Sequence, residues 1–453
     1  MGKLFGTDGV RDVANTKLTP ELAFQLGRAG AYVLTKKTAG APRVLLAKDS
    51  RRSGDMLEAA LTAGLCSIGA QVFHAGVIPT PAVAYLVRRY NLCAGVMISA
   101  SHNKMADNGI KFFNSEGFKL SDALEEEIES LIEEINTTGD NLPRPVGEGV
   151  GMINQVKEAA KDYVSYLAST VFGLNLDGYK IALDCANGAT SEVAPWIFKK
   201  LGAQVLTIHN TPDGSNINDK CGSTHIESLQ AFVQAEGADI GIAFDGDGDR
   251  MFALCENGGV VDGDVTLAIC GLDLKERSQL AQNTIVATVM SNQGLEIFCR
   301  ANEINLYRAD VGDRYVLEKM LSDNLQFGGE QSGHLIFRRH STTGDGILAA
   351  LQLVAVMSRK KMQLSELASV LETFPQVLLN AAVPNNRKHE LLTNPQIQKA
   401  QSEIESAMKG EGRILIRPSG TEPVVRVMLE GRDKSKIENY AKTLVDIIQK
   451  NLT

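Results

Sequence analysis

The sequence predicts an α/β protein of three or four domains whose sheets are largely parallel. Short apolar runs typical of strands alternate with helical patterns, and this order of elements occurs three times. A chain of 453 residues is also too long for a single hydrophobic core. Ligands bind beyond the carboxyl ends of the strands in such sheets, so the loops that follow the strands are the expected functional sites.

The first copy of the repeat follows a polar N-terminal segment. Thr19 and Pro20 provide the N-cap and the first residue of a helix. The pattern then predicts a strand at 43–47, a helix to about Ile68, a strand at 69–73, a helix near 81–90 and a strand at 94–98. This last strand ends in the polar loop 99–103.

Two further copies begin at Tyr179 and Thr284. The second predicts strands at 180–183, 202–206 and 239–244 with a helix at 190–201, and residues 202–205 repeat the tetrapeptide of 69–72. The third predicts strands at 284–289 and 304–307 and a glycine-rich turn at 327–334. Because loops 99–103, 245–250 and 329–334 each follow a strand, the three copies are expected to bring them to one cleft.

The domain boundaries are expected at changes in composition. A Pro/Gly-rich stretch at 136–151 is typical of a linker, and further boundaries are expected near Gly258 and Phe374. The tail lacks the strand–helix–strand order and contains a strand at 424–429 and a helix from about Lys434. The predicted domains are 1–150, 151–257, 258–373 and 374–453.

Bulk composition excludes several classes of protein. The formal net charge of -8 disfavours general binding to nucleic acid or to an anionic membrane, and no apolar run reaches transmembrane length. The seven cysteines are scattered and form no C-x-x-C pair, so most are expected to be buried free thiols. Since the N-terminus does not have the pattern of a signal peptide, we expect a cytoplasmic protein.

The loop 245–250 is the strongest candidate for a metal site. Asp245, Asp247 and Asp249 alternate with glycines after a buried strand, and their carboxylates would repel one another without a cation. Carboxylate ligands favour Mg²⁺ or Ca²⁺ over zinc. An EF-hand is excluded because Arg250 stands where that loop needs glycine and because a strand precedes it. A solvated acidic turn is the remaining alternative.

Other loops carry candidates for catalysis and binding. Ser101 is a candidate nucleophile, although neither a Ser-His pair nor the lone Lys111 is strong evidence by itself. Glu330, Ser332 and His334 offer the mixture of donors and acceptors that suits sugar hydroxyls. Hydroxyls, exposed N–H groups and bidentate arginines predict a phosphate site, and this site would comprise Arg417, Ser419, Gly420, Thr421 and Arg426. A metal, a nucleophile and a phosphate clamp together indicate phosphoryl transfer.

These motifs resemble the α-D-phosphohexomutase superfamily, and the resemblance runs essentially from end to end. It is carried by residues 5–11, 98–103, 107–111, 245–250, 329–334 and 417–423. The resemblance implies four domains, three of them related α/β domains with mostly parallel sheets and the fourth a smaller C-terminal α+β domain, around a central cleft.

The resemblance also implies roles for the residues. Ser101 would carry a phosphoryl group, and one Mg²⁺ per site would bind an oxygen of that phosphoserine together with Asp245, Asp247 and Asp249. Glu330 and Ser332 would hold sugar hydroxyls, while the residues of 417–426 would hold the non-reacting phosphate. Lys111 and His334 are both candidates for the acid/base role, and Arg11 and Arg250 of the shared motifs are expected among the catalytic residues.

The implied reaction interconverts glucosamine 6-phosphate and glucosamine 1-phosphate, with glucosamine 1,6-bisphosphate as intermediate and activator. A sugar phosphate is thus the expected partner, and a homodimer the expected assembly. Two alternatives stay open: a member of the superfamily that acts on mannose or glucose phosphates, and a non-catalytic module that binds a sugar phosphate or calcium.

Overall fold

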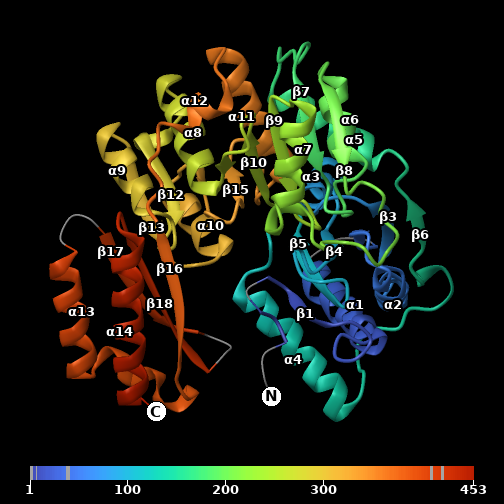
Figure 1. The fold of residues 1–453 in the computed structure, drawn as a ribbon. Helices are drawn as coiled ribbons and strands as arrows, with labels where there is room; N and C mark the ends of the chain where they lie inside the picture. The colour runs from blue at the N-terminus through green and yellow to red at the C-terminus, as the bar shows by residue number, and fades with distance from the viewer. Residues whose placement is uncertain (1–3, 7, 37–40, 409–411, 420–422, 453) are drawn as a thin grey trace. The chain divides into compact units, whose positions relative to one another are not determined.

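The computed structural model describes residues 4–6, 8–36, 41–408, 412–419 and 423–452. The chain forms two compact units, Met1–Met290 with Ile304–Ser369 and Ser291–Glu303 with Val370–Thr453. Three sheets belong to the first unit and one to the second (Figure 1). None of the helices among the described residues is long and apolar enough to cross a membrane.

The first sheet has six strands in the order β1-β5-β4-β2-β3-β6. Its strands β2, β3, β4 and β6 pair in parallel, whereas β5 pairs antiparallel with both β4 and β1. The elements of this region are β1 (Val10–Val13), α1 (Pro20–Thr35), β2 (Arg43–Lys48), α2 (Ser53–Ser67), β3 (Gln71–Val77), α3 (Thr80–Arg89), β4 (Ala94–Ile98), β5 (Asp107–Asn114), α4 (Asp122–Thr138), β6 (Ile153–Gln155) and α5 (Ala159–Thr170).

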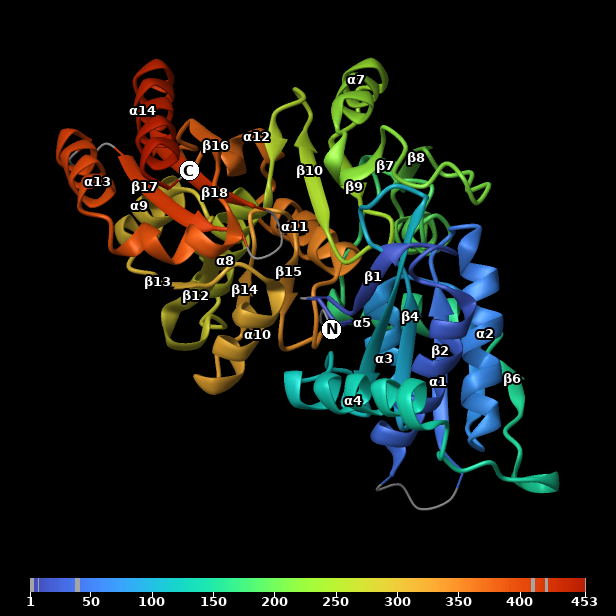
Figure 2. The same cartoon turned by 90° about the horizontal axis from the view of Figure 1, so that it is seen from below.

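Helices cover both faces of the first sheet. The helices α1, α2 and α4 share one core with the strands, while α3 contacts β2 and β4 on the other face (Figure 2). Leu26, Leu57, Leu61 and Ile128 of this core are fully buried, and burial of such a side chain contributes about 1.5–3 kcal/mol. The acidic helix α4 fully buries only Ile128 and Ile132.

The second sheet has the order β11-β10-β9-β7-β8 and the third has the order β13-β12-β14-β15. The second region comprises β7 (Lys180–Asp184), α6 (Val193–Lys200), β8 (Gln204–Ile208), α7 (Glu227–Glu236), β9 (Ile240–Phe244), β10 (Met251–Cys255) and β11 (Val260–Val261). The third comprises α8 (Gly263–Glu276), β12 (Thr284–Thr288), β13 (Asn305–Ala309), α10 (Asp313–Ser322), β14 (Phe327–Gly329), β15 (Leu335–Phe337), α11 (Gly346–Lys360) and α12 (Leu364–Ala368).

One strand order recurs in all three sheets, which confirms the repeat predicted from the sequence. The orders β5-β4-β2-β3, β10-β9-β7-β8 and β15-β14-β12-β13 are equivalent, and the first pair of each is antiparallel. The sequence predicted the parallel strands but not these antiparallel hairpins. Each hairpin connection is one of the three loops singled out above, so equivalent loops carry the candidate residues.

The repeated tetrapeptide has a conformational reason. Gly69 and Gly202 both have positive φ, 92° and 100°, which favours glycine. Each therefore forms a turn, and the strands begin later than predicted, at Gln71 in β3 and at Gln204 in β8. The helix predicted at 190–201 is likewise shorter in the structure and spans α6.

The second unit contains a three-stranded antiparallel sheet in the order β16-β18-β17. Figure 1 shows α13 and α14 against this sheet, and both contribute apolar side chains to its core. Its elements are α9 (Gln293–Ala301), β16 (Gln376–Ala382), α13 (Pro395–Ala407), β17 (Gly412–Pro418), β18 (Val424–Gly431) and α14 (Lys434–Leu452).

The cysteines are as expected from the sequence. All seven are free thiols, and five of them are buried.

Candidate active site

Ser101 lies in the loop between β4 and β5 and faces the loop that follows β9. It is 1% exposed, and its hydroxyl donates a hydrogen bond of 2.5 Å to Asp245 Oδ2. The neighbouring His102 Nδ1 lies 3.5 Å from Ser101 Oγ. Burial and the positive charge of Arg250 lower the pKa of His102 to about 4, so this imidazole is neutral at neutral pH. The fold thus brings the predicted nucleophile to the predicted metal loop.

Asp245, Asp247 and Asp249 are all at least 97% buried. Each offers a carboxylate oxygen, and these atoms lie within 4.8 Å of one another. Burial and the charges of Asp249 and Asp247 raise the pKa of Asp245 well above its usual value. The Oδ1 atoms of Asp247 and Asp249 are buried and have no hydrogen-bond partner among the described residues. Buried oxygens that the protein leaves unpaired are what a cation site requires, so the three carboxylates fit a metal ion.

Lys111, on β5, places an amino group beside two of the three aspartates. Its Nζ lies 2.8 Å from Asp247 Oδ2, 3.0 Å from Asp8 Oδ2 and 3.9 Å from Asp249 Oδ2. Burial alone would lower the pKa of Lys111, but the carboxylates of Asp247 and Asp8 outweigh burial and raise it. In turn, Lys111 overcomes the effect of burial on Asp247 and lowers the pKa of that carboxyl. Lys111 is therefore an ammonium ion in this site.

Sequence reasoning missed two partners of this network. Asp8 contacts Lys111, pairs with Arg11 and lies 2.6 Å from Lys119 Nζ. Thr80, at the start of α3, donates from Oγ1 to Asp247 Oδ2 at 2.6 Å and from its backbone N–H to the Asp247 carbonyl. Asp8 lies within the motif 5–11, so the sequence could have indicated a role for it. Nothing in the local sequence of Thr80 indicated a role.

The loop after β14 meets the loop after β9. Arg250 and His334 form an antiparallel bridge, and Arg250 Nε lies 3.9 Å from Asp249 Oδ1. Neither ring nitrogen of His334 has a hydrogen-bond partner within the described part of the chain, and Nε2 lies 3.6 Å from Asp313 Oδ2. Glu330 Oε1 accepts from the N–H of Gly312 at 3.2 Å. The third repeat therefore contributes to the same site.

Ser332 belongs to this loop as well. Its hydroxyl donates to Glu330 Oε2 at 3.4 Å. The serine and the carboxylate thus form a pair of the kind predicted to hold sugar hydroxyls.

The predicted phosphate site lies in the second unit. Arg417 on β17 and Arg426 on β18 are direct cross-strand partners. Burial and the charge of Arg426 lower the pKa of Arg417, as expected for two like charges that face each other on a sheet. Lys388, which sequence reasoning missed, donates to the Ser419 carbonyl at 2.6 Å. Gly420 and Thr421 lie outside the described residues. The basic side chains form the kind of cluster that an anion would stabilise.

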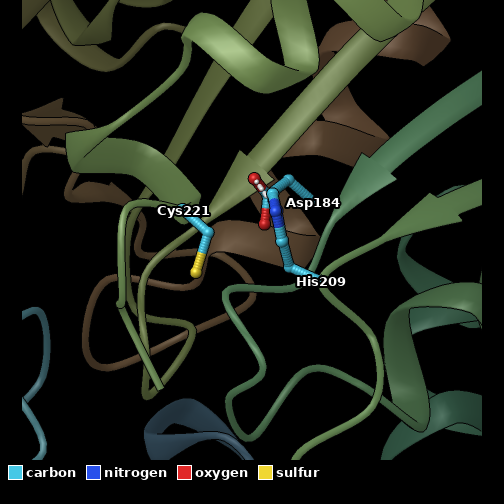
Figure 3. A group of neighbouring side chains, drawn as sticks. All are labelled: Asp184, His209 and Cys221. Carbon is cyan, nitrogen blue, oxygen red and sulfur yellow. Dashed lines mark hydrogen bonds and ion pairs between the residues drawn. The ribbon is translucent and has the colours of Figure 1, made fainter. Parts of the chain in front are cut away.

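A second group of metal-ligating side chains lies in the second repeat (Figure 3). The ligand atoms of Asp184, His209 and Cys221 also lie within 4.8 Å of one another. However, Asp184 Oδ1 accepts from the N–H of Ala186 at 2.8 Å, and Oδ2 accepts from the Gly222 N–H and from His209 Nδ1, both at 2.9 Å. Burial and the carboxylate of Asp184 raise the pKa of the Cys221 thiol to about 12. These protons already occupy the ligand atoms, so hydrogen bonds account for the cluster.

Comparison with known families defines the class of protein. Four models of the phosphoglucomutase/phosphomannomutase family match in order: the alpha/beta/alpha domain I at 2–139, domain II at 161–259, domain III at 262–374 and the C-terminal domain at 378–447. The chain belongs to this family of phosphohexomutases, and it is an isomerase. This result sets aside the non-catalytic module.

Individual relatives narrow the class. The chain is 55% identical to the phosphoglucosamine mutase of Ruminiclostridium cellulolyticum over the full length of both chains. It therefore falls among the phosphoglucosamine mutases of that family.

Solved structures share the fold. A phosphoglucomutase/phosphomannomutase family protein from Burkholderia thailandensis is 22% identical, with a TM-score of 0.81 over 99% of this chain and 97% of that one. The Aspergillus fumigatus N-acetylphosphoglucosamine mutase, in complex with GlcNAc-6P and magnesium, is 17% identical, with a TM-score of 0.73 over 99% and 96% of the chains.

Proposed function

We propose that the protein interconverts glucosamine 6-phosphate and glucosamine 1-phosphate through a phosphoryl group carried by Ser101, with glucosamine 1,6-bisphosphate as intermediate and activator. The observation that carries this proposal is the 2.5 Å contact between the Ser101 hydroxyl and Asp245 beside two further buried aspartates. The full-length similarity to a phosphoglucosamine mutase supports the choice of sugar.

The metal proposed for this site is Mg²⁺, one per active site. Asp245, Asp247, Asp249 and the phosphorylated Ser101 would hold it, since an all-oxygen set of ligands suits a hard cation. The relative from Aspergillus fumigatus was solved with magnesium. When bound, Mg²⁺ supplies positive charge that neutralises the charge developing on the transferred phosphoryl group.

The residues of the chain would carry out two mirror-image transfers. In the first, the bond between phosphorus and Ser101 Oγ breaks as a sugar hydroxyl forms its bond to phosphorus. The hydroxyl loses a proton, and the serine oxygen gains one. In the second transfer, the other phosphoryl group of the bisphosphate returns to Ser101.

The two acid/base candidates differ in their surroundings. His334 is the better base, because both of its ring nitrogens lack hydrogen-bond partners among the residues described. Lys111 is held as an ammonium ion by Asp247 and Asp8, so it is suited to neutralising charge. Arg11 and Arg250 would add to this positive charge near the transferred group.

Substrate recognition would combine two sets of groups. Glu330 and Ser332 would bind sugar hydroxyls. The non-reacting phosphate would relieve the repulsion between Arg417 and Arg426, with Ser419, Gly420 and Thr421 adding donors. The bounds of the four domains remain predictions, and so do the homodimer and the cytoplasmic location. The lack of nucleic-acid and membrane partners is likewise a prediction. Light scattering would test the dimer.

The decisive assay compares glucosamine 6-phosphate, mannose 6-phosphate and glucose 6-phosphate by kcat/KM, with Mg²⁺ and a trace of the matching bisphosphate. We expect a clear preference for the amino sugar. A preference for mannose or glucose phosphate would retain the chemistry and overturn the substrate. Intact mass should show a phosphorylated fraction that Ser101→Ala abolishes together with turnover, and turnover by Ser101→Ala would refute the carrier role.

A further inference from the structure

The loop that bears Ser101 has an unusual backbone conformation. Ser101 has a φ of 53°, in the left-handed region that non-glycine residues rarely adopt. Its N–H donates to Ser99 Oγ at 2.9 Å, and Ser99 Oγ donates to Asp49 Oδ2 at 2.6 Å. Such strain persists only where the surroundings over-determine the conformation.

Arg51 supplies much of that constraint. Its guanidinium is buried and donates to four carbonyl oxygens of the serine loop, those of Ser101 at 3.0 Å, Asn103 at 2.8 Å, Asp107 at 3.0 Å and Lys104. The sequence analysis assigned no role to Arg51. In the structure, the Arg51 side chain holds the serine loop together through these four hydrogen bonds.

Asn218 reaches the same loop from the second repeat. Its Nδ2 donates to the carbonyls of Ser101 at 2.8 Å and Asn103 at 3.0 Å. Its own backbone is left-handed, with a φ of 56°, and its N–H donates to the Ala186 carbonyl at 3.0 Å. Gly246 also packs closely against this loop, since a Cβ at that position would lie 2.6 Å from the Ser101 carbonyl oxygen. The first and second repeats therefore bind the same two carbonyl groups of the serine loop.

We propose that Arg51 and Asn218 form a clamp that positions Ser101 for phosphoryl transfer without contacting the substrate. Both donate to the same two carbonyls, so together they fix the left-handed turn that directs Ser101 Oγ toward Asp245. This inference rests on the proposed role of Ser101 as the phosphoryl carrier.

The test compares steady-state constants for Asn218→Ala, Asn218→Asp and Arg51→Lys. A displaced nucleophile slows the chemical step, so we expect Asn218→Ala to lower kcat roughly 10- to 100-fold while KM stays nearly unchanged. Asn218→Asp should lower kcat further, because its carboxylate would face two carbonyl oxygens. For the double variant Asn218→Ala with Arg51→Lys, kcat should fall by less than the product of the two single-variant factors, because the two side chains share acceptors.

Two neighbours serve as controls. Arg52 and Asp219 are exposed, so Arg52→Lys and Asp219→Asn should retain the kcat of the parent protein. A kcat of Asn218→Ala within twofold of the parent value would overturn the clamp, and so would a loss confined to KM or to the thermal midpoint. Turnover by Ser101→Ala would instead overturn the proposed function, which separates the two failures.

A second inference comes from a cavity of about 720 Å³ whose lining includes none of the candidate active-site residues. Arg277, Arg339 and Arg359 line it. Asp273 pairs with Arg277 at 3.1 Å and with Arg359 at 2.6 Å, while Arg339 has no ion-pair partner in the described ranges of the chain. Phe172, also part of the lining, is 97% exposed. The cavity therefore combines excess positive charge with an exposed aromatic ring.

We infer that this cavity binds a nucleoside diphosphate, with the phosphates on the arginines and the base against Phe172. Its volume lies within the range of about 300–1,000 Å³ typical of small-molecule sites. Three guanidiniums with a single carboxylate suit a group that carries two or more negative charges.

Calorimetric titration with ADP and UDP tests this site. We expect saturable binding that Arg339→Ala combined with Arg277→Ala weakens at least tenfold, whereas the exposed Arg300→Ala does not. Phe172→Ala should weaken it as well. The proposal would be overturned if neither nucleotide bound or if the double variant bound them as tightly as the parent protein. It would also be overturned if the protein bound inorganic phosphate but neither nucleotide.

Discussion

Two clusters in the second repeat bring three possible metal ligands equally close together but differ in their hydrogen bonding. Asp245, Asp247 and Asp249 follow β9, while Asp184 ends the adjacent strand β7 beside His209 and Cys221. In both clusters the ligand atoms lie within 4.8 Å. Spacing alone therefore does not identify a metal site.

The difference lies in what the protein offers each oxygen. Both oxygens of Asp184 accept hydrogen bonds from backbone N–H groups, whereas Asp247 and Asp249 each keep a buried Oδ1 without a partner in the described chain. An unsatisfied buried carboxylate oxygen is costly unless a ligand completes it. Hydrogen-bond satisfaction thus separates a cation site from a cluster that holds loops in place.

The largest expected effect is that of Asp247→Asn. It removes one ligand charge, and we expect kcat to fall roughly 100- to 1,000-fold, the usual scale for loss of one charge-stabilising group. The parent protein should gain thermal stability on addition of Mg²⁺, because the metal binds the folded state, and the variant should lose that gain. Near-normal turnover with an intact Mg²⁺-dependent shift would contradict the metal assignment.

An intermediate effect is expected for Asp184→Asn. The amide leaves a backbone N–H or His209 Nδ1 without an acceptor. Such a loss lowers the free energy of unfolding by about 1–3 kcal/mol when the group is buried. We expect a lower thermal midpoint but an unchanged Mg²⁺ concentration for half-maximal activity. An increased Mg²⁺ requirement would instead show that this cluster belongs to the metal site.

Much of the site was predictable because its motifs are local. The aspartates 245–249, Ser101 and Glu330 stand in polar loops directly after apolar strands, and the repeat of elements predicted that these loops meet. Thr80, Arg51 and Asn218 were missed because their roles depend on contacts between segments far apart in sequence. The antiparallel hairpins were missed for a similar reason, since strand direction is set by pairing and not by composition.

The smallest expected effect concerns the pH dependence of stability at the Asp184 cluster. The hydrogen bond to Asp184 raises the pKa of His209 from its usual value of 6.5. A group whose pKa is raised on folding stabilises the protein below its unfolded-state pKa, and this contribution is lost as pH rises through the folded-state value. The difference in thermal midpoint between the parent protein and His209→Gln should therefore shrink as pH rises above about 6.5.

A transition metal at Asp184, His209 and Cys221 would reverse this trend. Metal ligands must lose their protons, so metal-dependent stabilisation grows with pH. Thermal melts across this pH range with and without Zn²⁺, with Asp239→Asn as an exposed-carboxylate control, distinguish the two cases. A midpoint difference that widens with pH and requires Zn²⁺ would make the second cluster a metal site, whereas a difference that narrows without any metal dependence supports a hydrogen-bonded cluster.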